Sequence, residues 1–178
     1  MGAQKIKAGF IEPMLLLRSS ELPDDDGWLK ELKLDGYRAV GIKTNGKVEL
    51  RSRNDNDFSN RYAAIAEALA KLPDETVLDG EIVALDGEGR PSFNILQNYG
   101  SSKAPILYYV FDVLVIAGVN VMGETLDARR ALLEKRLLPK LADPIRYSPE
   151  LKGRMGDGNK ISSLATTTRL GVLYCQVL

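Results

Sequence analysis

An Asn-Gly pair at positions 45 and 46 separates two stretches rich in residues typical of β-strands, RAVGIKT (38–44) and KVELRSR (47–53). A two-residue hairpin turn of type I′ needs a positive φ at both central residues, and Asn and Gly tolerate this conformation best. The sequence therefore predicts a β-hairpin, and an antiparallel sheet is the frame into which the rest of the chain must fit.

The remaining hydrophobic pattern adds strands and helices to this hairpin. Further strands are predicted for WLKELKL (28–34), TVLDGEIVALD (76–86), ILYYVFDVLVIAG (106–118) and the start of IRYSPEL (145–151). Helices are predicted at 61–72, at 92–100 and at 125–138, where Pro139 would end the helix. In the first helix, Tyr62, Ile65, Leu69 and Leu72 lie on one stripe. The pattern indicates an α+β fold with a mainly antiparallel sheet and helices against it.

Composition excludes several kinds of chemistry. The chain of 178 residues has no His, which rules out imidazole bases and His-ligated metals, and a single Cys, which cannot form an internal disulfide. Lys plus Arg and Asp plus Glu both number 24, so any contact with nucleic acid must come from a local basic patch. No apolar stretch is suited to spanning a bilayer as a helix, and we expect a cytoplasmic protein without membrane contact.

The octapeptide ELKLDGYR (31–38) places a lysine between two carboxylates. If the strand runs through it, Glu31, Lys33 and Asp35 share one face and the intervening leucines point to the other. An amphipathic strand with a solvated charged face would show the same pattern. The choice between this alternative and a reactive lysine depends on the rest of the chain.

Several further motifs follow in order. They are FIEPML (10–15), Lys33-Leu34-Asp35-Gly36, Ser52-Arg53, Asp79-Gly80-Glu81, SFNILQ (92–97) and Phe111-Asp112. Together they resemble the adenylation domain of ATP-dependent DNA ligases, particularly the bacterial ligases of nonhomologous end joining, within the covalent nucleotidyltransferase superfamily. The resemblance covers about residues 9–152. It implies an α+β, ATP-grasp-like fold of mainly antiparallel sheets flanked by helices.

The resemblance also implies a role for each matched residue. Lys33 would be the catalytic nucleophile and would also contact the nucleotide. The other nucleotide-binding residues would be Glu31, Arg38, Arg53, Glu81 and Phe111, with Phe111 stacked on adenine. Asp35 and Glu81 would help to hold Mg²⁺. For Asp112, which lies in an apolar run, we expect only a structural role, with a hydrogen-bonded or charged partner if it is buried.

The chemistry of an amine agrees with these implied roles. An ordinary lysine has a pKa of about 10.4, so it must lose a proton before it can attack phosphorus. Attack on the α-phosphorus of ATP would give a lysyl-AMP phosphoramidate and release pyrophosphate, with ATP and Mg²⁺ as the cofactors. Catalysis of such an in-line displacement depends mainly on positioning and electrostatics.

The later motifs of the family are not found in the sequence. The only Glu-Gly pair is Glu88-Gly89, which comes before Phe111 and lacks the following lysine, and Lys152 and Lys160 do not fit a Lys-x-Lys motif. We expect residues 1–153 to form a partial adenylation domain and 154–178 an atypical C-terminal tail, with the OB-fold domain absent.

Three functions remain open at this point. The chain can be a ligase-like domain that forms lysyl-AMP slowly, in DNA repair and recombination, and cannot seal nicks alone. It can be a catalytically inactive remnant that binds DNA or nucleotide, or a nucleotidyltransferase with an RNA acceptor.

Two partners are expected. A basic face formed by Arg38, Lys43, Arg51 and Arg53 would bind nicked or ended duplex DNA weakly and without sequence preference. The apolar GVLYCQVL (171–178) should pair as a strand, either within its own sheet or with a second copy as a homodimer.

Overall fold

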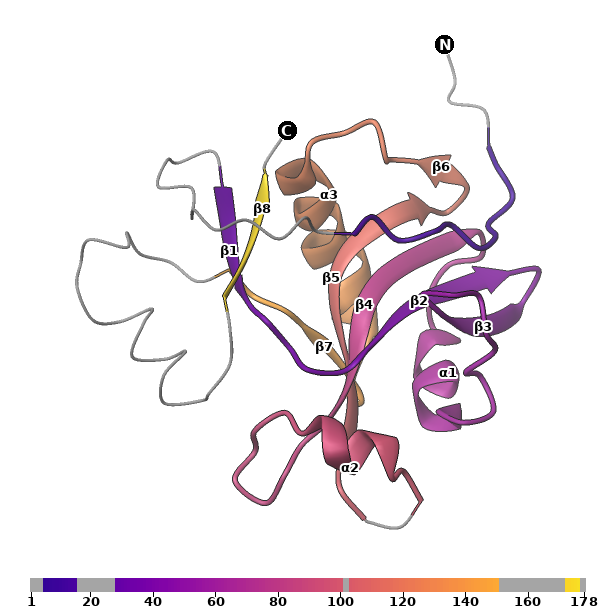
Figure 1. Cartoon of the computed structure of the whole chain (residues 1–178). Helices are drawn as coiled ribbons and strands as arrows, with labels where there is room; N and C mark the ends of the chain where they lie inside the picture. Colours follow the sequence, from indigo (N-terminus) through magenta and orange to yellow (C-terminus); the bar gives the residue numbers. More distant parts are fainter. Residues whose placement is uncertain (1–4, 16–27, 101–102, 151–171, 177–178) are drawn as a thin grey trace.

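The computed structural model describes residues 5–15, 28–100, 103–150 and 172–176 (Figure 1). The strands are β1 (Trp28–Leu32), β2 (Tyr37–Thr44), β3 (Lys47–Ser52), β4 (Thr76–Ala84), β5 (Ile106–Ile116), β6 (Val119–Asn120), β7 (Ile145–Tyr147) and β8 (Val172–Gln176). The helices are α1 (Ala63–Leu69), α2 (Phe93–Gln97) and α3 (Leu126–Leu132). These elements form the predicted α+β fold.

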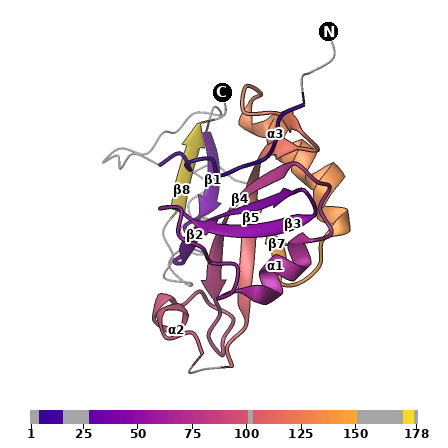
Figure 2. The same ribbon diagram turned by 90° about the vertical axis from the view of Figure 1, so that its right-hand side faces the viewer.

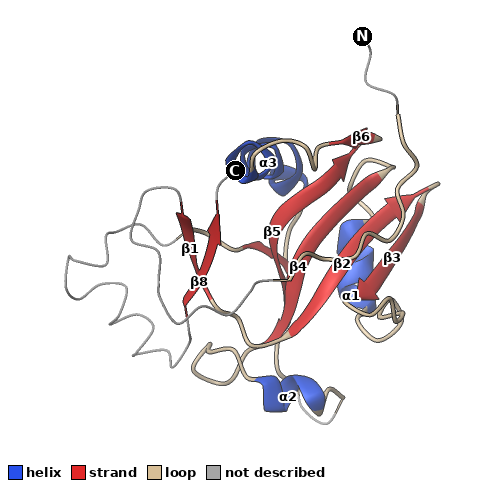
Figure 3. Ribbon diagram, turned by 45° about the horizontal axis from the view of Figure 1, so that its top comes forward, coloured by secondary structure: helices blue, strands red, loops and turns tan. Residues whose placement is uncertain are grey.

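The main sheet has the order β3-β2-β4-β5-β6, and its strands pair antiparallel along this path (Figure 3). The predicted hairpin joins β2 to β3, with φ of 50° at Asn45 and 73° at Gly46. β7 adds a parallel pairing on β5, so the prediction of a mainly antiparallel sheet is confirmed with one parallel neighbour.

One face of the sheet carries the helices. Tyr62, Ile65, Leu69 and Leu72, the predicted stripe around α1, are all buried in this core. Side chains of α2 and of the segment after α3 belong to the same apolar cluster, and Figure 2 shows α1 and α3 on the same side of the sheet. The prediction that helices cover one face is confirmed.

The opposite face is partly covered by the N-terminal segment, which crosses the sheet in Figure 1. Ala8 is buried in a second apolar cluster with Val40, Ile42 and Val77, and neighbouring residues of the segment pack against it. The Ala8 N–H donates to the carboxylate of Glu75, which fixes the segment to the loop before β4. The rest of this face stays available for polar side chains.

The helix predicted at 125–138 is less regular than expected. Thr125 caps α3 by accepting a hydrogen bond from the Ala128 N–H at 3.3 Å. After Leu132 the chain continues through a π-helical turn at Leu133–Leu137 and a 3₁₀ turn at Leu138–Lys140. Pro139 lies inside the 3₁₀ turn, because a proline near the start of a helical turn removes an N–H that has no partner there.

The C-terminal apolar stretch pairs within the same chain, but in a separate two-stranded sheet with β1 and not in the main sheet. β8 runs antiparallel to β1, with Leu32 opposite Val172 and Trp28 opposite Gln176. The remainder of the tail, residues 151–171 and 177–178, lies outside the described residues. β1 ends at Leu32, two residues earlier than the predicted strand. Within the described ranges, no helix combines the length and apolar character required to cross a membrane.

Candidate active site

Lys33 and Asp35 lie exposed in the connection between β1 and β2. Glu31, in contrast, is 5% exposed and pairs with Arg130 at 2.7 Å. The prediction that Glu31, Lys33 and Asp35 share one polar face of a strand is therefore wrong. The chain leaves β1 after Leu32, so strand alternation no longer applies to Lys33 and Asp35, and Arg130 provides the opposite charge that allows Glu31 to be buried.

Gly36 connects this loop to β4. A Cβ atom at position 36 would lie 2.1 Å from the carbonyl oxygen of Ile82, which is far inside van der Waals contact. The Gly36 N–H donates to the carboxylate of Glu81. The glycine of the Lys-x-Asp-Gly motif is thus required by close packing on β4, and it brings the motif against Glu81.

Arg38 connects β2 to both β4 and β5. Its Nε and Nη2 donate to the two carboxylate oxygens of Asp79 at 2.6 and 2.7 Å. Its guanidinium carbon also lies 4.4 Å from the centroid of the Phe111 ring, a cation–π distance. Strand alternation places Glu81 on the same face of β4 as Asp79. Side chains from three separate sequence motifs therefore meet on one face of the sheet.

Glu81 has an unusual protonation equilibrium. Burial raises the pKa of this carboxyl to about 7, and the nearby charge of Arg38 only partly opposes the effect. The charges of Asp79 and Asp35 raise this pKa further. A partly buried carboxyl that titrates near neutral pH is a feature of functional sites, because small changes in its surroundings alter its charge.

The carboxylates of Asp35 and Glu81 suit a metal ion that is already bound to phosphate. Within the described ranges, no three side chains of His, Cys, Asp or Glu are grouped closely enough to hold a metal. Asp35 and Glu81 lie near enough to interact electrostatically. Since Mg²⁺ commonly takes one or two carboxylates and completes its shell with phosphates and water, this pair suits a nucleotide-bound Mg²⁺.

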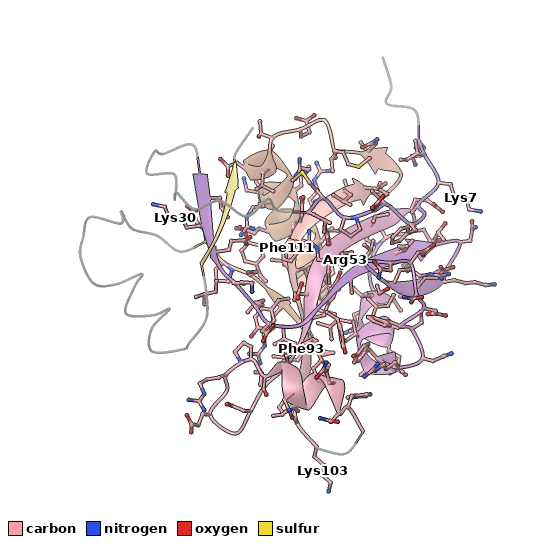
Figure 4. The ribbon with its side chains drawn as sticks, viewed as in Figure 1. Lys7, Lys30, Arg53, Phe93, Lys103 and Phe111 are labelled. Carbon is pink, nitrogen blue, oxygen red and sulfur yellow. The ribbon has the colours of Figure 1, made fainter. Side chains whose placement is uncertain are left out.

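Arg53 and Phe111 lie in the central part of the view in Figure 4. The Arg53 N–H donates to the carbonyl oxygen of Arg38 at 3.1 Å, and the Arg53 side chain is exposed in the turn after β3. The Phe111 ring is half-buried, with Arg38 over it. Arg38 thus lies beside Phe111, Glu81 and Arg53. That these residues and Lys33 bind one nucleotide stays a prediction.

The prediction that four cations of the hairpin together form one basic face is wrong. Lys43 donates to the carbonyl oxygens of Ala70 and Leu72, each at 2.7 Å. Arg51 pairs with Glu49 at 2.6 Å, and Arg38 is held by Asp79. The partners of Lys43 and Arg38 lie far along the chain, at the end of α1 and on β4, so the sequence does not show them. Glu49 lies two residues before Arg51 on β3. Arg53 is the exposed cation of this set, whereas the other three are partly buried.

The structural role expected for Asp112 is confirmed. It is 9% exposed, and its two carboxylate oxygens accept hydrogen bonds from Arg129 at 2.9 and 2.8 Å.

Arg130 is the residue of this site that sequence reasoning missed. It is 4% exposed and contacts Glu31 and the carbonyl oxygens of Phe111 and Ser148. The helical spacing in the sequence indicates that Arg130 is buried, because it stands three and seven residues before the buried Leu133 and Leu137. A cation on the apolar stripe of a helix indicates a buried partner of opposite charge.

This chain is similar in sequence to known DNA ligases. Residues 16–155 match the family "ATP dependent DNA ligase domain". The multifunctional non-homologous end joining protein LigD of Pseudomonas aeruginosa is 41% identical over 134 residues, which cover 74% of this chain and 16% of that protein. The DNA ligase-like protein LigB of Bacillus subtilis, described as derived from the SPbeta prophage, is 32% identical over 70% of this chain and 46% of its own length.

Solved structures of mycobacterial ligases also match this chain. The crystal structure of the ligase domain of LigD from M. tuberculosis superimposes with a TM-score of 0.70 and 32% identity, covering 84% of this chain and 48% of that chain. A mycobacterial DNA ligase D complexed with ATP and MES gives the same values. The fold and the site thus define a nucleotidyltransferase domain. This chain belongs to the family of ATP-dependent DNA ligase adenylation domains and is of the LigD type, and it spans less than half the length of these four relatives.

Proposed function

We propose that this chain forms lysyl-AMP from ATP at Lys33, slowly, as a DNA ligase adenylation domain does in its first step. The observation that carries the proposal is the convergence of three motifs: the Gly36 N–H donates to the Glu81 carboxylate, and the Arg38 guanidinium lies over the Phe111 ring. Lys33 is exposed in the same loop as Gly36. Membership of the ligase family supports the same reaction.

The reaction is an in-line displacement in which the neutral Lys33 amine attacks the α-phosphorus. An N–P bond forms, the P–O bond to pyrophosphate breaks, and the amine gives up a proton. Phe111 offers its ring to adenine, while Arg38 and Arg53 offer guanidinium groups that pair well with phosphate oxygens. When bound with ATP, Mg²⁺ would neutralise phosphate charge, and Asp35 and Glu81 are the carboxylates that would hold it.

Glu31 is the one proposed nucleotide-binding residue whose carboxylate is already bound to another side chain. Its Oε1 accepts a hydrogen bond from Arg130 at 2.7 Å. Any contact between Glu31 and adenine must therefore be made by the carboxylate in the position that Arg130 sets.

The proposed acceptor is nicked or ended duplex DNA, bound weakly and without sequence preference. The names of the relatives, which are end-joining proteins and DNA ligases, support this substrate class. We propose that this chain alone does not seal nicks efficiently, because its sequence lacks the Glu-Gly-x-x-x-Lys and Lys-x-Lys motifs. Losing one preorganised group of this kind costs about 10² to 10³ in rate. The proposed setting is DNA repair and recombination in the cytoplasm.

A second candidate is an inactive domain that binds nucleotide or DNA without chemistry. It is favoured by the strand that pairs with β1. β8 has the sequence VLYCQ, without a charged residue, and it lies antiparallel to the strand that leads to Lys33. A strand without lysines next to the nucleophile supplies no charge to neutralise the α-phosphate.

Two assays separate these candidates. With ATP labelled at the α-phosphate, the first candidate predicts label that stays with the protein through denaturing electrophoresis, and the second predicts none. A labelled nicked duplex, incubated beside a complete ligase, tests sealing. Efficient joining by this chain would contradict the proposal that it cannot seal nicks alone.

A further inference from the structure

We propose that Arg130 is a positioning residue, which sets the distance between the strand that leads to Lys33 and the strand that carries Phe111. The positioning role itself is argued from contacts in the free protein. Its effect on reaction rate rests on the proposed function.

One guanidinium group joins three segments of the chain. Nη1 of Arg130 donates to Oε1 of Glu31 at 2.7 Å and to the carbonyl oxygen of Phe111 at 3.1 Å. Nη2 donates to the carbonyl oxygen of Ser148 at 2.7 Å. The guanidinium carbon also lies 4.9 Å from the centroid of the Tyr147 ring. A planar fork with fixed donor directions can hold these partners in one relative arrangement, whereas a flexible ammonium cannot.

β1 needs such a connection because it is not a member of the main sheet. Among the described strands it pairs only with β8. Among the described strands, no backbone pairing with the six-stranded sheet therefore fixes the position of β1. Glu31 stands near the end of this strand, two residues before Lys33. The ion pair with Arg130 supplies a direct link between β1 and β5, at the peptide unit of Phe111 itself.

The burial of this pair shows that water does not compete for it. The side chains of Arg130 and Glu31 are 5% and 7% exposed. Burial raises the pKa of Glu31, and Arg130 opposes that effect. Removing one partner would leave the other charge buried without compensation, so the geometry persists only when both are present.

Arg129 provides a matched control. It is the preceding residue of α3 and also forms a two-pronged pair with a buried carboxylate, that of Asp112. Its side chain donates to Asp112 and to the carbonyl oxygen of Glu124, and neither residue belongs to β1. The same replacement at 129 and 130 therefore changes a comparable ion pair with and without the link to the nucleophile strand.

The experiment compares Arg130→Lys, Arg129→Lys and Glu31→Gln with the wild-type chain, after circular dichroism has shown that each variant folds. Hydrogen exchange of the β1 amides, measured without ATP, reports the link directly. We expect loss of protection in β1 for Arg130→Lys and Glu31→Gln and unchanged protection for Arg129→Lys. The rate of label transfer from α-labelled ATP should fall roughly 10²-fold in Arg130→Lys, because small misplacement of reacting groups costs about that much. Arg129→Lys should stay near the wild-type rate.

The two arms fail in different ways. Equal β1 protection in Arg130→Lys and wild type would overturn the positioning role, whatever the rates. Equal loss of rate in Arg129→Lys and Arg130→Lys would overturn it too, since a general loss of packing would then explain both. If the wild-type chain takes up no label, the proposed function falls, and the exchange arm still decides the positioning role.

Discussion

The guanidinium of Arg38 covers the ring of Phe111 at 4.4 Å while two of its nitrogens hold Asp79. Arg38, the last residue of the Lys-x-Asp-Gly-x-Arg motif, is thus held by β4. It lies over Phe111, the residue that by family resemblance would stack on adenine. Because Arg38 occupies one face of the ring, we expect the base to stack on the remaining surface of Phe111.

The first prediction concerns this ring. Phe111→Leu keeps an apolar side chain but removes the aromatic face, and stacking contributes about 1 kcal/mol, or about fivefold in dissociation constant. Titration with ATP should show weaker binding by about that factor. Ile95→Leu, on α2 in the opposite apolar cluster, is the control. Equal ATP affinity in Phe111→Leu and wild type would contradict a stacking role.

The second prediction concerns pH. Glu81 has a pKa of about 7 in the folded chain, raised from 4.5 by burial. Between these values unfolding releases a proton, so the free energy of unfolding falls as pH rises from about 4.5 to about 7 and levels off above. The expected contribution is about 2 kcal/mol after allowance for partial exposure. Denaturant titrations of wild type and Glu81→Gln should differ in this window, and parallel curves would contradict the assignment.

The third prediction concerns the glycine of the nucleophile motif. Gly36→Ala brings a methyl group against the Ile82 carbonyl oxygen, and we expect a loss of about 1–3 kcal/mol in the free energy of unfolding together with slower label uptake. Gly87→Ala is the matched control, because a Cβ there meets nothing within 4 Å. Thermal unfolding of the pair checks the difference. A Gly36→Ala chain as stable as Gly87→Ala would show that the close approach to β4 is absent.

The fourth prediction concerns DNA. Arg53 is exposed, whereas Lys43 is engaged with Ala70 and Leu72, so Arg53→Ala should lower the slope of log affinity against log salt by about 1 and Lys43→Met should leave it unchanged. Titration of a nicked duplex at several salt concentrations measures the slopes. A larger effect from Lys43→Met would mean that the hairpin cations act together after all.

The local pattern of the sequence was sufficient for much of the fold. Asn45 and Gly46 can adopt positive φ, so the hairpin followed from turn chemistry, and the stripe through Ile65 and Leu69 followed from helical periodicity. The parallel pairing of β7 with β5 joins residues that are far apart in the chain, and no local pattern encodes it.

Motifs specify residue types, so they nominate Lys33, Glu81 and Phe111 for the site, and these roles stay predictions. The contacts of the site are less accessible to the sequence. The sequence could not show that Arg130 reaches Glu31, 99 residues away, or that β1 ends before Lys33. Such partners depend on how helices and strands are placed in space, and that placement decides whether a charge is solvated or buried.

The intact mass of the chain after incubation with ATP and Mg²⁺, followed by peptide mapping, tests the central claim most directly. We predict a slow gain of one AMP, located on Lys33, that persists in Lys103→Ala and is absent from Lys33→Ala. Lys103 is exposed and lies beyond α2, away from Arg53 and Phe111, which makes it a suitable control (Figure 4). An unchanged mass in the wild-type chain, or an adduct that survives Lys33→Ala, would contradict the account.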